Sequence, residues 1–216
     1  MTEHDSRNTN FRVTLADKTS ALAYYAKIAK KYESHVNGNA LLRYFRRKER
    51  KSIEHFLHID SHTKSLIDVG CGSGTWAKYA KERGLKVKAV DANEAMVKAL
   101  QPLVDEVEVI DLDTWDPKQK FDRVVCAGVL DFVLDPEKAM KTLCQLVAPG
   151  GRLVLLVPDS GPFGLYYRME KALIGVKVNL YSQKWLTEQA QKHGLSLVGR
   201  KRPLPSNVTY AFQAKA

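Results

Sequence analysis

The 216-residue sequence contains no apolar run that approaches the roughly 20 residues a helix needs to cross a bilayer. Its first stretch, MTEHDSRNTNFRV, is polar, includes acids and lacks the hydrophobic segment of a signal peptide. Both absences predict a protein of the cytoplasm without a membrane span.

Cysteine is scarce as well. The sequence has three cysteines, widely spaced in apolar surroundings: Cys71, Cys126 and Cys144. An odd number without a spacing pattern favours reduced thiols over disulfides, in agreement with a cytoplasmic location. His55, His58 and His62 could share one face of a helix, but no cysteine or carboxylate cluster completes a metal site beside them. The sequence therefore predicts no metal centre.

Acidic residues are outnumbered, with 24 Asp and Glu against 34 Lys and Arg and a formal net charge of +10. Residues 1–64 hold 13 basic and 7 acidic side chains, which is +6 of that excess. Such a surface favours an anionic partner: a phosphorylated or carboxylated metabolite, an acidic carrier protein, an anionic membrane surface or nucleic acid. The alternative is a solvated face. Hydrophobic residues at 44% and charged ones at 27% are typical of one globular domain with its own core.

The chain is organised around the stretch Ser65–Asp91, SLIDVGCGSGTWAKYAKERGLKVKAVD. Ser65–Val69 is a short apolar run that predicts a strand, and Thr75–Arg83 has helical character. Gly84 predicts the end of that helix, and Leu85–Val90 is a second apolar, β-branched run. The stretch therefore predicts strand, glycine loop, helix and strand, with the carboxylate of Asp91 at the end.

Asp68, Gly70, Gly72 and Gly74 occupy alternate positions through the predicted loop. Glycines let the backbone turn sharply and let a ligand approach amides that a Cβ would shield. The following helix directs unpaired N–H groups and the positive end of its dipole at that ligand. Asp91 is placed to accept hydrogen bonds from the two hydroxyls of a ribose. These features predict a site for a nucleoside cofactor.

Two cofactor fingerprints fit the loop. Gly72-x-Gly74-x-x-Ala77 with Asp91 about 20 residues on satisfies the dinucleotide pattern, which would indicate NAD. The other register, Asp68-x-Gly70-x-Gly72-x-Gly74, resembles the first motif of class I S-adenosylmethionine (SAM)-dependent methyltransferases of small molecules. An acid in the first strand is awkward beside a pyrophosphate but suits a methionine ammonium, and about sixty residues of helical pattern precede the loop.

Two later segments support the methyltransferase register. FDRVVCAGVLDFVLDP (Phe121–Pro136) resembles the fourth strand and loop of that family, and LVAPGGRLVLL (Leu146–Leu156) resembles its turn and fifth strand. The resemblance covers residues 65–157. It implies an α/β fold: a doubly wound, mostly parallel sheet of seven strands in the order 3-2-1-4-5-7-6, with an N-terminal helical cap. The short link between the last two strands predicts that they pair antiparallel.

The expected organisation has a mobile tail over residues 1–18, with Thr19 or Ser20 capping the first helix. A helical cap covers residues 19–64, and its second helix carries a basic side from Arg43 to Lys51. The methyltransferase domain covers 65–216.

The resemblance implies where the cofactor lies. Asp91 would bind the ribose, Met96 would reach an adenine face, and Asp111, preferred over Asp113, would accept from the adenine amino group. In the family a tyrosine of the cap often closes over the methionine end, and Tyr32 is the candidate here; the alternative is that it belongs to the buried face of a helix. The full predicted set is Tyr32, Asp68, Gly70, Cys71, Gly72, Gly74, Asp91, Ala92, Met96, Asp111, Leu112 and Ala127.

No single general base stands out. The candidates are Asp131, Tyr166, Tyr167 and His35. Asp131 lies where many relatives carry histidine or glutamate, so a catalytic role does not transfer to it directly. We expect methyl transfer to an oxygen or nitrogen nucleophile of a small molecule that is anionic or linked to a carrier protein. The alternatives are an RNA methyltransferase, against which no NPPY-like or PC-type motif follows the fourth strand, and a SAM-binding regulator without turnover.

Residues 158–181 form an insertion, too long for an ordinary strand-to-helix link of about 2–6 residues. Pro158, Gly161, Pro162 and Gly164 predict that its first half lacks regular structure. Its apolar side chains predict a lid over the methyl group that selects the acceptor. The alternative is a sixth helix that covers the sheet.

Overall fold

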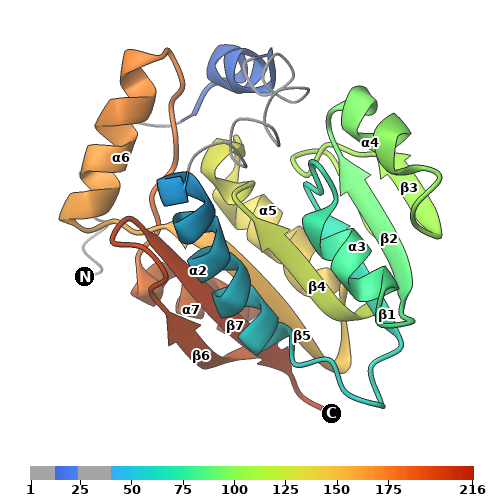
Figure 1. The fold of residues 1–216 in the computed structure, drawn as a ribbon. Helices are drawn as coiled ribbons and strands as arrows, with labels where there is room; N and C mark the ends of the chain where they lie inside the picture. The colour runs from blue at the N-terminus through green and yellow to red at the C-terminus, as the bar shows by residue number, and fades with distance from the viewer. Residues whose placement is uncertain (1–12, 24–39) are drawn as a thin grey trace.

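The computed structural model describes residues 13–23 and 40–216. Its centre is a seven-stranded sheet in the predicted order β3-β2-β1-β4-β5-β7-β6 (Figure 1). The strands are β1 (Ser65–Val69), β2 (Lys86–Asp91), β3 (Glu106–Val109), β4 (Phe121–Ala127), β5 (Val147–Pro158), β6 (Leu195–Lys201) and β7 (Asn207–Ala214). As expected, β6 and β7 pair antiparallel; β7 also runs antiparallel to β5, whereas the other pairs are parallel.

Helices cover both faces of this sheet. Those that do so are α2 (Ala40–Leu57), α3 (Thr75–Lys81), α4 (Glu94–Leu100), α5 (Pro136–Gln145) and α7 (Gln183–Lys192). Helix α6 (Pro162–Leu173) follows β5, and a 3₁₀ turn η2 (Leu130–Phe132) follows β4. Side chains of α2, α3 and α4 belong to one hydrophobic cluster, and those of α5 and α7 belong to the other. The predicted doubly wound α/β fold is therefore confirmed.

The central strands are apolar on both sides because helices bury both faces of a parallel sheet. In β4, Val124 and Cys126 pack into the α5–α7 cluster, whereas Val125 between them packs into the α2–α3 cluster. This two-sided burial fixes the strands, so the loops at their carboxyl ends meet along one edge of the sheet, here called the carboxyl rim.

The first helix begins earlier than predicted. It is helical from residue 15, not from Thr19 or Ser20, so residues 13–18 do not belong to a mobile tail. Thr14 and Asp17 cap it reciprocally: the Asp17 amide donates to Thr14 Oγ1 at 3.3 Å, and the Thr14 amide donates to Asp17 Oδ2 at 2.9 Å. Lys18 is buried, and its contacts lie far away in the sequence. Their distance explains why local patterns missed them.

The insertion is more regular than predicted. Helix α6 starts at Pro162, in the first turn, where proline costs no hydrogen bond. Gly164 does not break the helix; it allows close packing, since a Cβ there would lie 1.6 Å from the Asp159 carbonyl oxygen.

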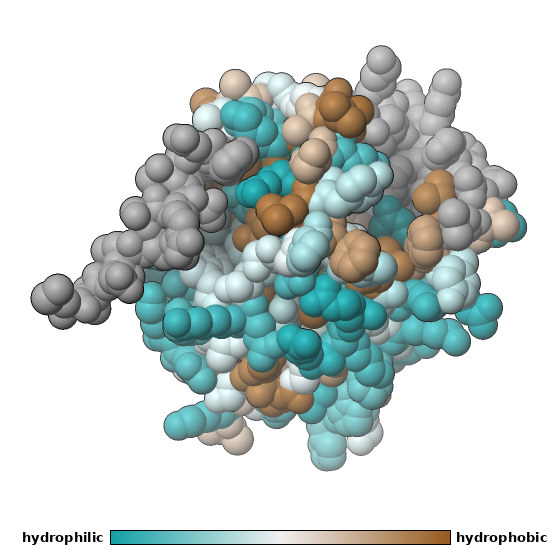
Figure 2. Space-filling view, turned by 90° about the vertical axis from the view of Figure 1, so that its left-hand side faces the viewer, coloured by the Kyte–Doolittle hydropathy of each residue, from teal (hydrophilic) through white to brown (hydrophobic). Residues whose placement is uncertain are grey.

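The alternative prediction, a helix that covers the sheet, does not describe the position of α6. It stands beyond the carboxyl rim, near helix 15–23 (Figure 1). It leaves Tyr166 69% and Leu173 87% exposed. Figure 2 views the side that carries α6 and shows hydrophobic groups there among hydrophilic ones. Within residues 13–23 and 40–216, no helix combines the length and apolarity needed to cross a membrane.

Candidate functional site

The glycine loop between β1 and α3 takes the left-handed conformation at three positions. Gly70, Gly72 and Gly74 have φ values of 69°, 51° and 78°, which side chains with a Cβ rarely adopt. A Cβ on Gly70 would lie 2.0 Å from Val129 Cγ2, and one on Gly74 would lie 2.3 Å from Leu100 Cδ2. A Cβ on Gly72 would meet no protein atom within 4 Å. Packing therefore requires two of the glycines, and Gly72 leaves open space for a ligand.

Asp91 is fixed beside this loop at the end of β2. The Gly72 amide donates to Asp91 Oδ2 at 2.8 Å, and the Asn93 amide donates to Asp91 Oδ1 at 2.8 Å. Burial raises the pKa of Asp91, and these two amides oppose the rise. The carboxylate is held in one orientation with acceptor capacity left over, as ribose hydroxyls require.

Asp68 lies beneath the loop and is only 1% exposed. The Ala77 amide donates to Asp68 Oδ2 at 3.0 Å, so the carboxylate holds the first turn of α3. Burial raises the pKa of Asp68 to about 7, and the nearby charge of Asp91 adds to the rise. The role visible here is support of the loop; contact with a methionine ammonium stays a prediction.

The predicted adenine side is formed by the ends of β2 and β3. Asn93 caps α4 and accepts from the Ala95 amide at 2.9 Å. Met96 on the first turn of α4 is half-buried, Ala92 is partly exposed, and Leu112 is buried. Asp111 has a 40% exposed side chain at the end of β3.

Asp113, which we did not prefer as the contact of the adenine amino group, has hydrogen-bond partners that give it a structural role. Its buried carboxylate accepts from the amides of Leu134, at 2.9 and 3.1 Å, and Asp135, at 3.2 Å. It therefore ties the end of β3 to the loop after β4. Lys18, which the sequence did not indicate, contacts both Asp111 and Asp113.

The loop after β4 continues the rim. Ala127 is partly exposed, and Gly128 after it has a φ of 69°. Asp131 in η2 is 4% exposed, and its Oδ1 has no hydrogen-bond partner among the residues that the structure describes. Burial raises the pKa of Asp131 to about 7, and a hydrogen bond from Tyr167 opposes this rise. A buried carboxylate with one oxygen unsatisfied is costly, which makes it a functional candidate.

The insertion holds η2 in place through residues the sequence did not indicate. The Asn179 amide donates to the Asp131 carbonyl at 2.8 Å, and Asn179 Nδ2 donates to the Val133 carbonyl at 2.8 Å. The Tyr181 hydroxyl donates to the Leu130 carbonyl at 2.6 Å. Residues 176–181 thus fix the backbone that carries Asp131.

Among the other candidates, the structure brings Tyr167 to Asp131 but leaves Tyr166 exposed. Tyr32 and His35 lie outside the described residues. Cys71 is buried in the loop, and burial raises the pKa of its thiol, so it is an inert packing group here. In the described ranges, no three His, Cys, Asp or Glu side chains gather as a metal site would require.

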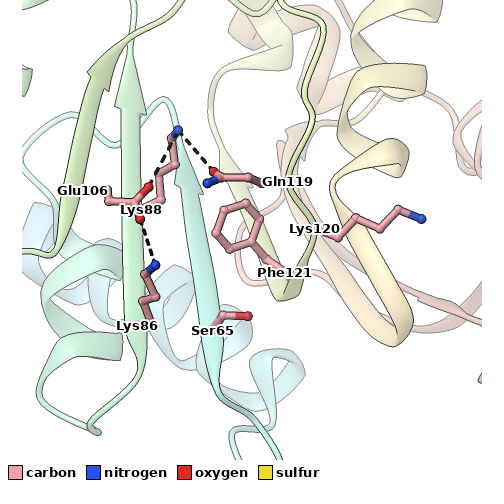
Figure 3. Close-up of a pocket in the computed structure, with 7 residues that line it drawn as sticks. All are labelled: Ser65, Lys86, Lys88, Glu106, Gln119, Lys120 and Phe121. Atoms are coloured by element: carbon pink, nitrogen blue, oxygen red, sulfur yellow. Dashed lines mark hydrogen bonds and ion pairs between the residues drawn. The ribbon is translucent and has the colours of Figure 1, made fainter.

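A cleft of about 200 Å³ lies at the opposite edge of the sheet, at the amino ends of β1 to β4 (Figure 3). Two of its three lysines are engaged: Lys86 pairs with Glu106 at 3.0 Å, and Lys88 donates to Gln119 at 3.3 Å. Lys120 points away from the cleft. The cleft is an ion network far from the glycine loop, so it is not the cofactor site.

The ends of β1, β2, β3 and β4 therefore meet along the carboxyl rim. There they bring together Gly72 with open space beside it, the fixed carboxylate of Asp91 and the exposed carboxylate of Asp111. The space over Gly72 and the acceptors Asp91 and Asp111 fit an adenosyl group. Fold and site together are those of an α/β protein with a candidate nucleoside-cofactor site at the switch point of its sheet.

Comparison with known proteins identifies the family. A family model described as a methyltransferase domain matches residues 40–199, so the chain belongs to the methyltransferase-domain family. The chain carries the domain of a SAM-dependent methyltransferase, as the family model and the O-methyltransferase relatives indicate. The predicted class I family, enzyme class and cofactor are confirmed.

Individual relatives show the extent of the similarity. The ubiquinone biosynthesis O-methyltransferase of Alkalilimnicola ehrlichii is 32% identical over 107 residues, which are 46% of this chain and 43% of that protein. The chain spans about half the length of the curated relatives it matches. The magnesium protoporphyrin IX methyltransferase of Synechocystis, solved with bound S-adenosylhomocysteine, shares the fold. Its TM-score is 0.72 at 17% identity, over 92% of this chain and 100% of that one.

Proposed function

We propose that the protein methylates an oxygen or nitrogen nucleophile of a small molecule held at the carboxyl rim, over the ends of β4 and β5. The observation that carries the proposal is the buried Asp131 carboxylate, unsatisfied at Oδ1 among the described residues and located in the loop after β4. The ubiquinone-biosynthesis relatives, named as O-methyltransferases, favour a hydroxyl acceptor.

In this proposal Gly72, Asp91 and Asp111 hold the adenosyl part of the cofactor. When bound, SAM supplies a methyl group on a sulfonium: the acceptor atom bonds to the methyl carbon as the carbon–sulfur bond breaks, its electron pair staying on sulfur. Asp131 accepts the proton that the acceptor's O–H or N–H releases. A pKa near 7 suits a general base at neutral pH. Tyr167 orients the carboxylate, and the remaining rate comes from alignment of the reactants.

We further propose that the acceptor is anionic. A groove of about 520 Å³ opens at the rim beyond β5, between the start of α6 and the link from β6 to β7. Lys48, Arg202, Phe163 and the segment 203–205 line it. Arg202 pairs with Asp159 at 2.8 Å, which leaves Lys48 as the excess charge. The groove lies about two strand spacings, or ~10 Å, from β4, so an acceptor of that length could reach both.

Most of the predicted basic side of α2 faces away from the sheet, as expected. Arg46 pairs with Glu49 at 3.4 Å and Arg50 with Glu54 at 2.7 Å, so these two arginines are partly neutralised. Lys48, which lies 4.8 Å from the centre of the Tyr44 ring, lines the groove instead. Replacement of Lys48 therefore tests the anionic acceptor better than replacement of the whole face.

Lys48→Gln is expected to raise KM for a carboxylated or phosphorylated acceptor several-fold at low salt and to leave KM for a neutral analogue unchanged. The loss should shrink in high salt, because screening removes the attraction in wild type too. Lys184→Gln, an exposed lysine on α7, is the matched control. Equal effects of both substitutions would show that net charge alone matters. An unchanged KM in Lys48→Gln would contradict the anionic acceptor.

The predicted lid is retained as a proposal for α6. Because Tyr166 is exposed, Tyr166→Ala is expected to change the free energy of unfolding by less than ~0.5 kcal/mol. It should lower kcat/KM for the acceptor without changing affinity for S-adenosylhomocysteine, measured by calorimetry. Unchanged acceptor kinetics would remove α6 from the site.

The function itself is tested by calorimetry with SAM, S-adenosylhomocysteine and NAD, followed by a screen of phenolic and amine acceptors. We expect binding of the first two ligands and turnover of a small acceptor. Methylation of RNA with a steep salt dependence would favour the nucleic-acid alternative. Tight SAM binding without turnover on any acceptor would favour a regulator.

We place the protein in the cytoplasm, in keeping with its three free, buried cysteines.

A further inference from the structure

The first helix reaches the predicted adenine side of the site through one buried cation. Lys18 has a 9% exposed side chain, and its Nζ lies 2.5 Å from Asp111 Oδ1 and also contacts Asp113 Oδ2. The pairs join residues 93 and 95 positions apart. A buried lysine between two carboxylates loses hydration, and both partners are needed to offset that loss.

Only one of the two carboxylate oxygens of Asp111 accepts these hydrogen bonds. Lys18 Nζ and the Asp113 amide, at 3.0 Å, both donate to Oδ1. Oδ2 takes no part in these bonds, and 40% of the side chain is exposed at the end of β3. Asp113 is committed to the amides of Leu134 and Asp135. Lys18 therefore holds one oxygen of Asp111 in a fixed place and leaves the other for a ligand.

Helix 15–23 is itself anchored, so Lys18 is a defined part of the rim. Thr14 and Asp17 cap the helix, and Lys177 pairs with Asp17 at 3.3 Å. Ala21 packs against Val176 and Val178 in a small hydrophobic cluster. The helix thus connects the predicted adenine side with the insertion that fixes η2.

We infer that Lys18 is a positioning residue for recognition of the cofactor's adenine. It neutralises the repulsion between Asp111 and Asp113 and orients Asp111 so that Oδ2 accepts from the adenine amino group. The inference rests on the proposed adenine role of Asp111. It makes the N-terminal helix part of the cofactor site. It also predicts that Lys18 contributes to the preference for adenine over a base without the amino group, which a lysine with only a structural role would not do.

The test is calorimetry with two probes, S-adenosylhomocysteine and S-inosylhomocysteine, in which a carbonyl oxygen replaces the amino group. Wild type should prefer the first by about tenfold or more, the scale of one hydrogen bond to a charged group. In Lys18→Met that ratio should fall toward one, mainly through weaker binding of S-adenosylhomocysteine. Lys184→Met, the same substitution at an exposed lysine of α7, should keep the wild-type ratio.

If Lys18→Met does not fold, Lys18→Gln serves as the second variant, with the same loss of ratio expected. A ratio unchanged in the folded variant would overturn the inference. Wild-type protein that binds both probes equally would also overturn it, while leaving the proposed methyltransferase function intact. Failure of wild type to bind S-adenosylhomocysteine at all would instead refute the placement of the cofactor site.

Discussion

Gly72→Val is expected to reduce affinity for S-adenosylhomocysteine by at least ~100-fold, about 2.7 kcal/mol. Two observations lead to this expectation. The Gly72 amide is bound to Asp91, and the space beside its Cα contains no protein atom within 4 Å of where a Cβ would lie. A branched side chain would fill the space that the cofactor needs. It would also strain a backbone with a φ of 51°, which β-branched residues disfavour.

Strain alone would weaken binding indirectly, so the prediction needs a control with equal strain. Gly84 has a φ of 77° and is exposed, and a Cβ added to it would also meet no atom within 4 Å. It follows α3 at the opposite end of that helix from the loop. Gly84→Val should therefore lose a similar amount of stability, about 1–2 kcal/mol for one left-handed residue, and should keep wild-type affinity. A similar affinity loss in both variants would show that Gly72 has no direct role.

Local sequence patterns were sufficient to predict the parts of the site formed by neighbouring residues. Alternating glycines after a buried strand predicted a sharply turning loop, and the structure has left-handed glycines there. The helix caps at Asn93 and Asp135 are of the same local kind. The glycine loop and each helix cap depend on contacts between residues that are close in the sequence, so the sequence alone indicates them. The strand order followed from resemblance to the methyltransferase family.

Predictions failed where a distant segment decides the structure. The segment Leu146–Leu156 was predicted to hold a turn followed by a strand, but β5 already starts at Val147, because the Phe121 amide donates to the Leu146 carbonyl and Val147 then pairs with β4. Lys18 could not be assigned, since its partners come from the end of β3. The surroundings of Asp131, on which its proposed role depends, likewise come from Tyr167 and Asn179 in the insertion. Composition and periodicity do not encode such pairings.

Asp131→Asn is expected to lower kcat/KM for a hydroxyl acceptor by about 10²–10⁴, the contribution typical of a general base. In wild type the active form is the carboxylate, so kcat/KM should rise between pH 6 and 8 through the pKa of about 7. The variant should lose this rise. Tyr167→Phe should move it to higher pH, because the Tyr167 hydrogen bond lowers the pKa of Asp131. The matched control is Asp135→Asn, which keeps the α5 cap and should leave the profile unchanged.

The same substitution should stabilise the protein, in a pH-dependent way that needs no acceptor. Burial raises the pKa of Asp131 from 3.8 to about 7, so between these values the folded protein holds a proton that the unfolded chain releases. The stabilisation that comes from this bound proton is complete below pH 4 and is lost as the pH rises through 7. Asp131→Asn avoids that loss. Its gain in melting temperature over wild type should be small at pH 4 and largest at pH 8. A gain that is equal at both pH values, together with unchanged kcat/KM, would refute the assignment of Asp131 as the proton acceptor.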